Sequence, residues 1–189
     1  MSSQLIKRII TSLFLSCLLT LMYFYPFVLI ISLIIIAMIT WIEFYALISK
    51  ILKKNSIKDK LSRFLYKSIS LLYLTLLVYF IFSIESYYLN FKIYLLYSVL
   101  VAVFSDVGGL VVGMSVKGKK LTKISPNKTI SGCVGSFVFS FFLVPLFNSE
   151  LTNHNLLILL IITMFISLAS QLGDLFISFL KRKANVKNT

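Results

Sequence analysis

Long, almost uncharged apolar runs are the feature that most constrains this 189-residue chain. Of its residues, 59% are hydrophobic and only 13% are charged, whereas a soluble domain is nearer half apolar and a quarter charged. Because a bilayer offers no water to backbone groups, runs of about 20 apolar residues cross it as helices. The composition therefore predicts an all-α integral membrane protein and excludes a soluble enzyme, a disordered chain and a disulfide scaffold.

The apolar runs predict a polytopic bundle of about six transmembrane helices. Pro26 follows the first run directly, and since the residue before a proline disfavours helix, we expect the first two helices to form a tight hairpin. No signal-peptide cleavage site follows the first run, which favours a retained helix. The six helices are predicted at residues 9–25, 27–49, 65–84, 93–116, 130–147 and 156–180, in one membrane-embedded domain covering 1–189.

Basic residues gather in alternate loops, and this asymmetry predicts the orientation. The chain has 19 Lys and Arg against 6 Asp and Glu, a net charge of +13. With the N-terminus in the cytoplasm, every basic residue except Lys92 falls in or beside the cytoplasmic segments 1–8, 50–64, 117–129 and 181–189, as the positive-inside rule requires. Both termini are therefore predicted to be cytoplasmic. The charge is attributed to topology and anionic lipids, with no nucleic-acid partner.

Glu43, Asp106 and Asp174 are acidic residues inside the predicted helices. A charge at the centre of a membrane helix costs roughly 2.5–3.5 kcal/mol, so such residues usually face a cavity and act there. Asp106 precedes Lys117 by 11 residues, or about 16 Å of helix, which puts it near the middle of the membrane. Asp174 lies about 10 Å from Lys181 by the same rise. We expect these carboxylates to be functional.

A polar stripe runs along the last predicted helix at intervals of three or four residues, the spacing of one helix face. A helix that faces only lipid has no reason to carry such a stripe, which therefore predicts a water-filled cleft leading to the cytoplasm. The stripe consists of Ser167, Ser170, Gln171, Asp174, Ser178 and Lys181.

The fourth predicted helix carries a second signal beside Asp106. Gly109 and Gly113 form a G-x-x-x-G pattern, which is typical of closely packed membrane helices. Close packing explains the two glycines but does not explain Asp106, for which we expect a chemical role.

The segment 125–129 predicts a helix start that binds phosphate. Its Ser, Pro, Asn and Thr residues suit a helix entry with free N–H groups, and Lys128 adds positive charge beside them. Gly132 allows close approach. Asp106 and Asp174 supply the oxygen ligands with which Mg²⁺ bridges to substrate phosphates. The residues by themselves indicate a membrane enzyme that moves phosphoryl or nucleotidyl groups onto a lipid.

Cys17 and Cys133 each lie inside an apolar run with no Cys or His neighbour at metal-ligand spacing. The pattern does not favour a metal site or a disulfide framework. We expect both to be membrane-buried thiols without a chemical role.

Three stretches, in this order and spacing, resemble the phosphatidate cytidylyltransferase (CDP-diacylglycerol synthase) family. SDVGGLVVG at 105–113 is similar to an aspartate- and glycine-containing helix of that family. KISPNKTISGCVGS at 123–136 is similar to its K-x-S-P-x-K-T-x-x-G-x-x-G loop and helix. SLASQLGDLFISFLKRKANVKN at 167–188 is similar to its stretch around Q-x-G-D and K-R, and TWIEFYAL at 40–47 is a weaker match.

The resemblance implies a cytidylyltransferase-like domain that converts CTP and phosphatidate, with Mg²⁺, into CDP-diacylglycerol and pyrophosphate, in a bacterial cytoplasmic membrane. The phosphate of phosphatidate would attack the α-phosphorus of CTP in line. The implied catalytic residues are Asp106, Lys128, Asp174, Lys181 and Arg182. The implied substrate contacts are Ser125, Pro126, Thr129, Gly132, Gln171, Ser178 and Lys187. The implied metal ligands are Asp106, Asp174 and Asn188.

The chain departs from the family pattern near its end and is interpreted as truncated relative to it. The family stretch ends in Lys-Asp where this chain has Lys187-Asn188. The family then continues with a histidine-glycine-glycine segment and a further helix, whereas this sequence stops at Thr189. Two alternatives therefore stay open. One is a catalytically inactive homologue that acts as a membrane scaffold or partner subunit, and the other is a CTP-dependent polyprenol or phytol kinase. An active protein is expected to form a homo-oligomer or to be completed by a partner subunit.

Overall fold

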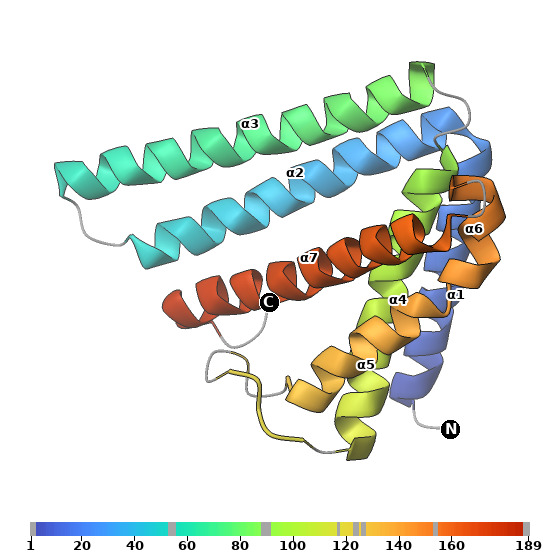
Figure 1. Ribbon diagram of the computed structural model, residues 1–189. Coiled ribbons are helices and arrows are strands. Elements are labelled where there is room, and N and C mark those ends of the chain that lie inside the picture. The colour runs from blue at the N-terminus through green and yellow to red at the C-terminus, as the bar shows by residue number, and fades with distance from the viewer. Residues whose placement is uncertain are drawn as a thin grey trace. The chain divides into compact units, whose positions relative to one another are not determined.

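The computed structural model describes residues 3–52, 56–87, 92–116, 118–122, 125, 128–152 and 155–186. Over these residues the chain is helical, with one isolated β-bridge in the loop before residue 130 (Figure 1). The helices group into two compact units, Met1–Lys92 and Ile93–Thr189, and each is described by itself. An all-α fold is therefore confirmed, while the single domain predicted over 1–189 stays a prediction.

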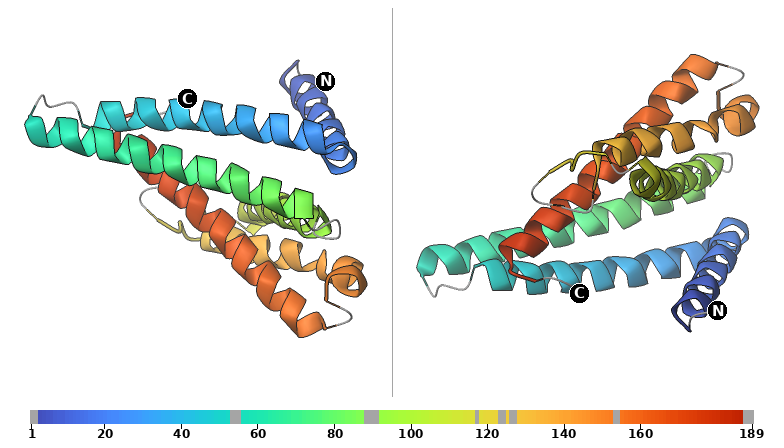
Figure 2. Two further views of the ribbon diagram at one scale, coloured as in Figure 1. Left: turned by 90° about the horizontal axis from the view of Figure 1, so that it is seen from above. Right: turned by 90° about the horizontal axis from the view of Figure 1, so that it is seen from below.

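The first unit is made of α1 (Ser3–Phe24), α2 (Pro26–Ile51) and α3 (Ile57–Tyr87). The hairpin between α1 and α2 forms as predicted, because Pro26 starts α2 at a position that needs no N–H donor and the preceding residue is extended. α2 and α3 run side by side along their length (Figure 2). The indole Nε1 of Trp41 donates to the Lys67 carbonyl oxygen at 3.3 Å and joins the two helices.

The second unit is made of α4 (Lys92–Val116), α5 (Ile130–Phe141), α6 (Val144–Thr152) and α7 (Leu156–Lys183). α7 packs against both α5 and α6. The buried core lies among the four helices, and its central residues are Tyr97, Val101, Leu143, Val144, Leu151 and Leu159.

The structure corrects the predicted number and limits of the membrane spans. Among the described residues, α2, α4, α7 and residues 57–85 of α3 are long and apolar enough to cross a bilayer. The helix predicted at 130–147 is instead broken, since α5 and α6 meet at an angle of 52°. If this bent pair is one span, the total is five, and the apolar part of α1, Ile10–Phe24, is a shorter helix. The orientation of the termini stays a prediction.

Glycines allow α4 and α5 to meet backbone to backbone. A Cβ atom added to Gly108 would lie 2.5 Å from the carbonyl oxygen of Gly135, and one added to Gly135 would lie 2.4 Å from Cβ of Val112. Gly109 and Gly113 face Ser136 and the Thr129–Gly132 turn at similarly short range. The close packing predicted for Gly109 and Gly113 is confirmed. We name the contact formed by Gly108, Gly109, Gly113, Gly132 and Gly135 the glycine seam.

Buried hydroxyl groups join α4 to α7. The Oγ atoms of Ser105 and Ser167 lie 2.9 Å apart, and both side chains are fully buried. The hydroxyls of Tyr97 and Thr163 are also hydrogen-bonded to each other. Ser167 therefore serves helix packing, which differs from the cleft-lining role that the polar stripe predicts for it. Hydrogen bonds of this kind between membrane helices average about 0.6 kcal/mol and reach about 1.7 kcal/mol.

Removing either hydroxyl of the Ser105–Ser167 pair is expected to destabilise the second unit modestly. We expect Ser105→Ala and Ser167→Ala each to lower the free energy of unfolding by roughly 0.6–1.7 kcal/mol, and the double variant to lose less than the sum. Unfolding in mixed detergent micelles measures this cycle. Ser115→Ala is the matched control, because Ser115 is exposed on α4 and bonds only within its own helix. Strict additivity of the two substitutions would contradict the pairing.

Candidate active site

A pocket of about 380 Å³ lies in the second unit among α4, α5, α7 and the loop before α5. Charged and polar groups reach it from three helices. The polar lining consists of Asp106, Lys128, Thr129, Ser136, Gln171 and Asp174. The apolar lining consists of Leu110, Met114, Leu121, Cys133 and Leu175.

Two carboxylates and one ammonium group face one another in the pocket. Lys128 Nζ donates to Asp174 Oδ2 at 2.9 Å, and the side chains are 30% and 56% exposed. Asp106 interacts electrostatically with both of these groups and with the Ser170 side chain. An ion pair this accessible contributes at most about 1 kcal/mol to stability. Its significance is therefore the arrangement of charge, with two negative groups and one positive group open to a ligand.

The loop before α5 positions Lys128. Lys120 and Thr129 form an antiparallel bridge, and the Leu121 N–H donates to the Lys128 carbonyl oxygen at 2.8 Å. One residue further, the Ile130 N–H donates to the Lys119 carbonyl oxygen at 2.9 Å. These bonds fix the backbone of Lys128 beside α7, so that its side chain can reach Asp174.

Thr129 caps α5, as the sequence predicts for a helix entry. Its backbone is extended, and its Oγ1 accepts the N–H of Gly132 at 3.0 Å. The Ile130 N–H is occupied by Lys119, so two amides of the first turn already have partners. The phosphate cradle predicted at this helix start thus has fewer free amides than expected. Lys128 carries the positive charge of the site.

Six of the residues predicted for the site line this pocket, and four other described ones do not. The pocket includes Asp106, Lys128, Thr129, Gly132, Gln171 and Asp174. Ser125, Ser178, Lys181 and Arg182 are described but do not line it. Pro126, Lys187 and Asn188 lie outside the described residues. Glu43 is exposed on α2 of the first unit.

Sequence reasoning missed the apolar wall of the pocket and the thiol of Cys133. Leu110 and Met114 follow Asp106 at intervals of four, on one face of α4. Cys133 lies four residues after Thr129 on α5. Extending the helical spacing outward from the polar residues would have found these side chains. Apolar residues are expected on every face of a membrane helix, so hydropathy alone does not distinguish them.

The pocket contains two carboxylates, a number of acidic ligands through which Mg²⁺ usually binds. Among the described residues, no three of His, Cys, Asp and Glu come together as a metal cluster. Mg²⁺ usually binds one or two carboxylates and completes its coordination with waters and substrate phosphates. Asp106 and Asp174, which line the same pocket, match this requirement without a third acidic ligand.

The apolar helices define the class of protein, an integral membrane protein, and its second unit holds a pocket that combines two carboxylates and a lysine with an apolar wall. The whole chain, residues 1–189, matches the Cytidylyltransferase family. The chain belongs to this family, and the resemblance drawn from its motifs is confirmed.

Individual relatives match part of the chain. The phosphatidate cytidylyltransferases of Staphylococcus haemolyticus (strain JCSC1435) and Bacillus subtilis (strain 168) are each 39% identical to it over 99 residues. That of Staphylococcus aureus (strain COL) is 41% identical over 99 residues. These matches cover 51% of this chain and 36–38% of each relative. No solved structure matches the chain significantly.

Proposed function

We propose that the protein transfers the cytidylyl group of CTP to phosphatidate, forming CDP-diacylglycerol and pyrophosphate for phospholipid synthesis in a bacterial cytoplasmic membrane. The observation that carries this proposal is the meeting of Asp106, Lys128 and Asp174 in one pocket. Membership of the Cytidylyltransferase family supports CTP as the nucleotide substrate. The names of the bacterial relatives support the lipid acceptor.

In the proposed reaction a phosphate oxygen of phosphatidate forms a bond to the α-phosphorus of CTP. The bond from that phosphorus to the oxygen bridging to the β-phosphate breaks, and pyrophosphate leaves with the electron pair. The attacking group is already an anion, so positioning and charge neutralisation are the main requirements. Lys128 would neutralise phosphate charge, and the pairing of its ammonium with a carboxylate in the pocket supports this role.

Asp106 and Asp174 are the carboxylates that would hold Mg²⁺. A bound ion supplies neutralisation of the triphosphate and leaving-group charge. The pairing of Lys128 with Asp174 holds the ammonium beside one of these carboxylates.

The apolar wall suits the lipid acceptor. Leu110 is 61% exposed and Met114 is 63% exposed, and both line the pocket that contains Asp106. Apolar side chains beside carboxylates match a substrate that carries a phosphate on a hydrocarbon body. A purely water-soluble acceptor would gain nothing from this wall.

Position-specific labelling of CTP tests the proposal against its alternatives. Purified protein with phosphatidate and Mg²⁺ is expected to move label from α-labelled CTP into lipid and to release γ-label as pyrophosphate. Movement of γ-label into a polyprenol or phytol would instead identify a lipid kinase. Folded protein that moves neither label, with either acceptor, would support the scaffold interpretation and overturn the proposal.

Nucleotide binding is expected to protect Cys133 from thiol reagents. Cys133 is half-buried and lines the pocket with Lys128 and Asp174, so a bound nucleotide should exclude a maleimide from it. We expect CTP with Mg²⁺ to slow labelling of Cys133 several-fold in a Cys17→Ser background. Peptide mass spectrometry after timed labelling measures the rate. Equal rates with and without CTP would contradict this placement of the nucleotide.

A further inference from the structure

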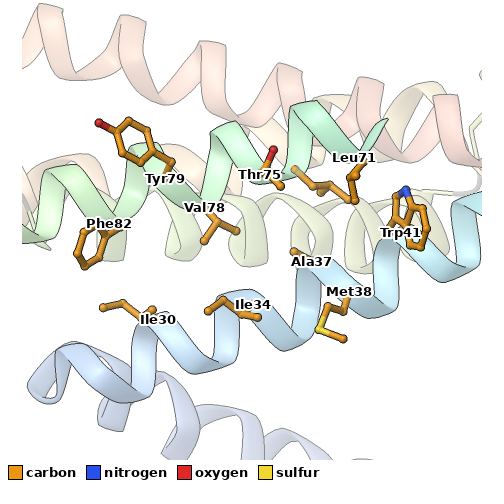
Figure 3. Close-up of a pocket in the computed structure, with 11 residues that line it drawn as sticks. Ile30, Ile34, Ala37, Met38, Trp41, Leu71, Thr75, Val78, Tyr79 and Phe82 are labelled. Carbon is orange, nitrogen blue, oxygen red and sulfur yellow. The ribbon is translucent and has the colours of Figure 1, made fainter. Parts of the chain in front are cut away.

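A second pocket, of about 440 Å³, lies in the first unit between α2 and α3. Its lining is almost entirely apolar, and Figure 3 shows side chains of the two helices facing each other across it. Ile30 and Phe82 lie at one end, and Trp41 and Leu71 lie at the other. The volume falls within the range of sites that bind small ligands. Nothing in the proposed transfer reaction uses this groove.

Cationic groups lie beyond the Trp41 end of the groove. Lys67 is one helical turn before Leu71 on α3, and its Nζ lies 3.1 Å from the centre of the Tyr45 ring. Arg63 is one further turn away on the same face and also acts electrostatically on Tyr45. In the described part of the chain, the structure pairs no carboxylate with Lys67. The groove thus joins an apolar channel to a positive end.

We propose that this groove binds one acyl chain of an anionic phospholipid whose headgroup is held by Lys67. The acyl chain lies along the apolar walls, and the phosphate meets the ammonium group where the walls end. A tryptophan beside a long cationic side chain is typical of the headgroup level of a bilayer. The positive end distinguishes an anionic lipid from a zwitterionic one. This site is independent of the proposed catalytic function, because it rests on the first unit alone.

The single tryptophan of the chain makes the groove directly measurable. Trp41 lines the groove and is the one Trp in the sequence, so intrinsic fluorescence reports the lipid that occupies it. The protein of residues 1–189 is reconstituted in mixtures of phosphatidylglycerol and phosphatidylcholine in which one lipid carries brominated acyl chains, which quench Trp. We expect brominated phosphatidylglycerol to quench more strongly than brominated phosphatidylcholine at equal mole fraction.

Two charge variants decide whether the preference belongs to the groove. A basic residue near a membrane surface contributes about 1 kcal/mol to anionic-lipid binding, so Lys67→Gln is expected to lower the relative affinity for phosphatidylglycerol about fivefold. Lys58→Gln removes the same charge about two and a half turns earlier, on the opposite face of α3, and is expected to leave the preference unchanged. Equal loss in both variants would overturn the proposal, because it would indicate general attraction to the surface.

Filling the groove gives an independent result. Ala37 lies on the α2 wall between the two ends (Figure 3), and Ala37→Phe is expected to reduce quenching by the anionic lipid to the level of the zwitterionic lipid. Circular dichroism confirms that each variant keeps its helix content. Equal quenching by the two lipids in the unsubstituted protein would overturn the proposed site. The absence of quenching by either lipid would also overturn it, because it would indicate that a second copy of the chain covers the groove.

Discussion

Asp174→Ala is expected to abolish most nucleotidyl transfer while leaving the protein folded. Its carboxylate is 56% exposed and pairs with Lys128 at 2.9 Å in the pocket, so removing it opens no core cavity. Removing one hydrogen-bond donor that stabilises transition-state charge typically lowers turnover by roughly 10²–10³-fold, and we expect the loss of this carboxylate to be of the same order. Incorporation of α-labelled CTP into phosphatidate, measured against Mg²⁺ concentration, is the assay. The free energy of unfolding is expected to stay within about 1 kcal/mol of that of the unsubstituted protein.

The form of the loss distinguishes a metal-binding carboxylate from a mere support for Lys128. If Asp174 holds Mg²⁺, residual activity in Asp174→Asn should need a higher Mg²⁺ concentration, whereas Lys128→Ala should not shift that requirement. If Asp174 only positions the ammonium group, both variants should fall equally with unchanged Mg²⁺ dependence. Glu150→Gln removes an exposed acid from α6 of the same unit and is the matched control. Full activity in Asp174→Ala would remove the carboxylate from the proposed mechanism.

Alanine in the glycine seam is expected to cause the largest loss of stability in the second unit. An added methyl at Gly135 would lie 2.4 Å from Cβ of Val112 and 2.8 Å from the carbonyl oxygen of Gly108. Because a backbone oxygen cannot rotate away, the helices must separate, and overpacking of this kind costs typically about 1–3 kcal/mol. Separation also displaces Asp106 on α4 from Lys128 before α5. We therefore expect Gly135→Ala and Gly108→Ala to lower both the free energy of unfolding and the transfer rate.

Gly173→Ala is the control for this prediction. A Cβ atom at Gly173 would meet nothing within 4 Å, although this glycine lies next to Asp174. Alanine there is expected to be neutral, or to stabilise α7 by up to about 1 kcal/mol through helix propensity. Detergent unfolding of the three variants under one condition compares them. Equal stability of Gly135→Ala and Gly173→Ala would show that α4 and α5 do not pack as described.

Helical spacing and buried charge predicted much of the site. Asp106 and Asp174 belong to different helices, yet both were expected at one cavity because lipid tolerates an acid only where water or a partner can reach it. The glycine pattern in α4 predicted close packing for the same steric reason that the structure shows at Gly109 and Gly113. These inferences needed only local sequence and the cost of burying charge.

The remaining features depend on tertiary contacts that no local pattern contains. Ser167 looked like part of a cleft-lining stripe, but its partner Ser105 is 62 residues away in sequence. The backbone pairing that occupies the Ile130 N–H depends on how the preceding loop folds back. The break between α5 and α6 lies within a continuous apolar run, where hydropathy cannot distinguish a bent helix from a straight one. Only Pro145, in the first turn of α6, marked it.

The bend between α5 and α6 limits how far α5 extends across the bilayer. The 12 residues of α5 measure about 18 Å, against a hydrocarbon thickness of about 30 Å. A segment this short reaches only part of the way across, so its two ends cannot both be at aqueous surfaces. The elbow at Leu143 and Val144, which are 4% and 2% exposed, is enclosed by protein, where non-helical backbone is tolerated at membrane depth. Lys128, two residues before α5 begins, therefore lies at the end of a helix that crosses only part of the bilayer.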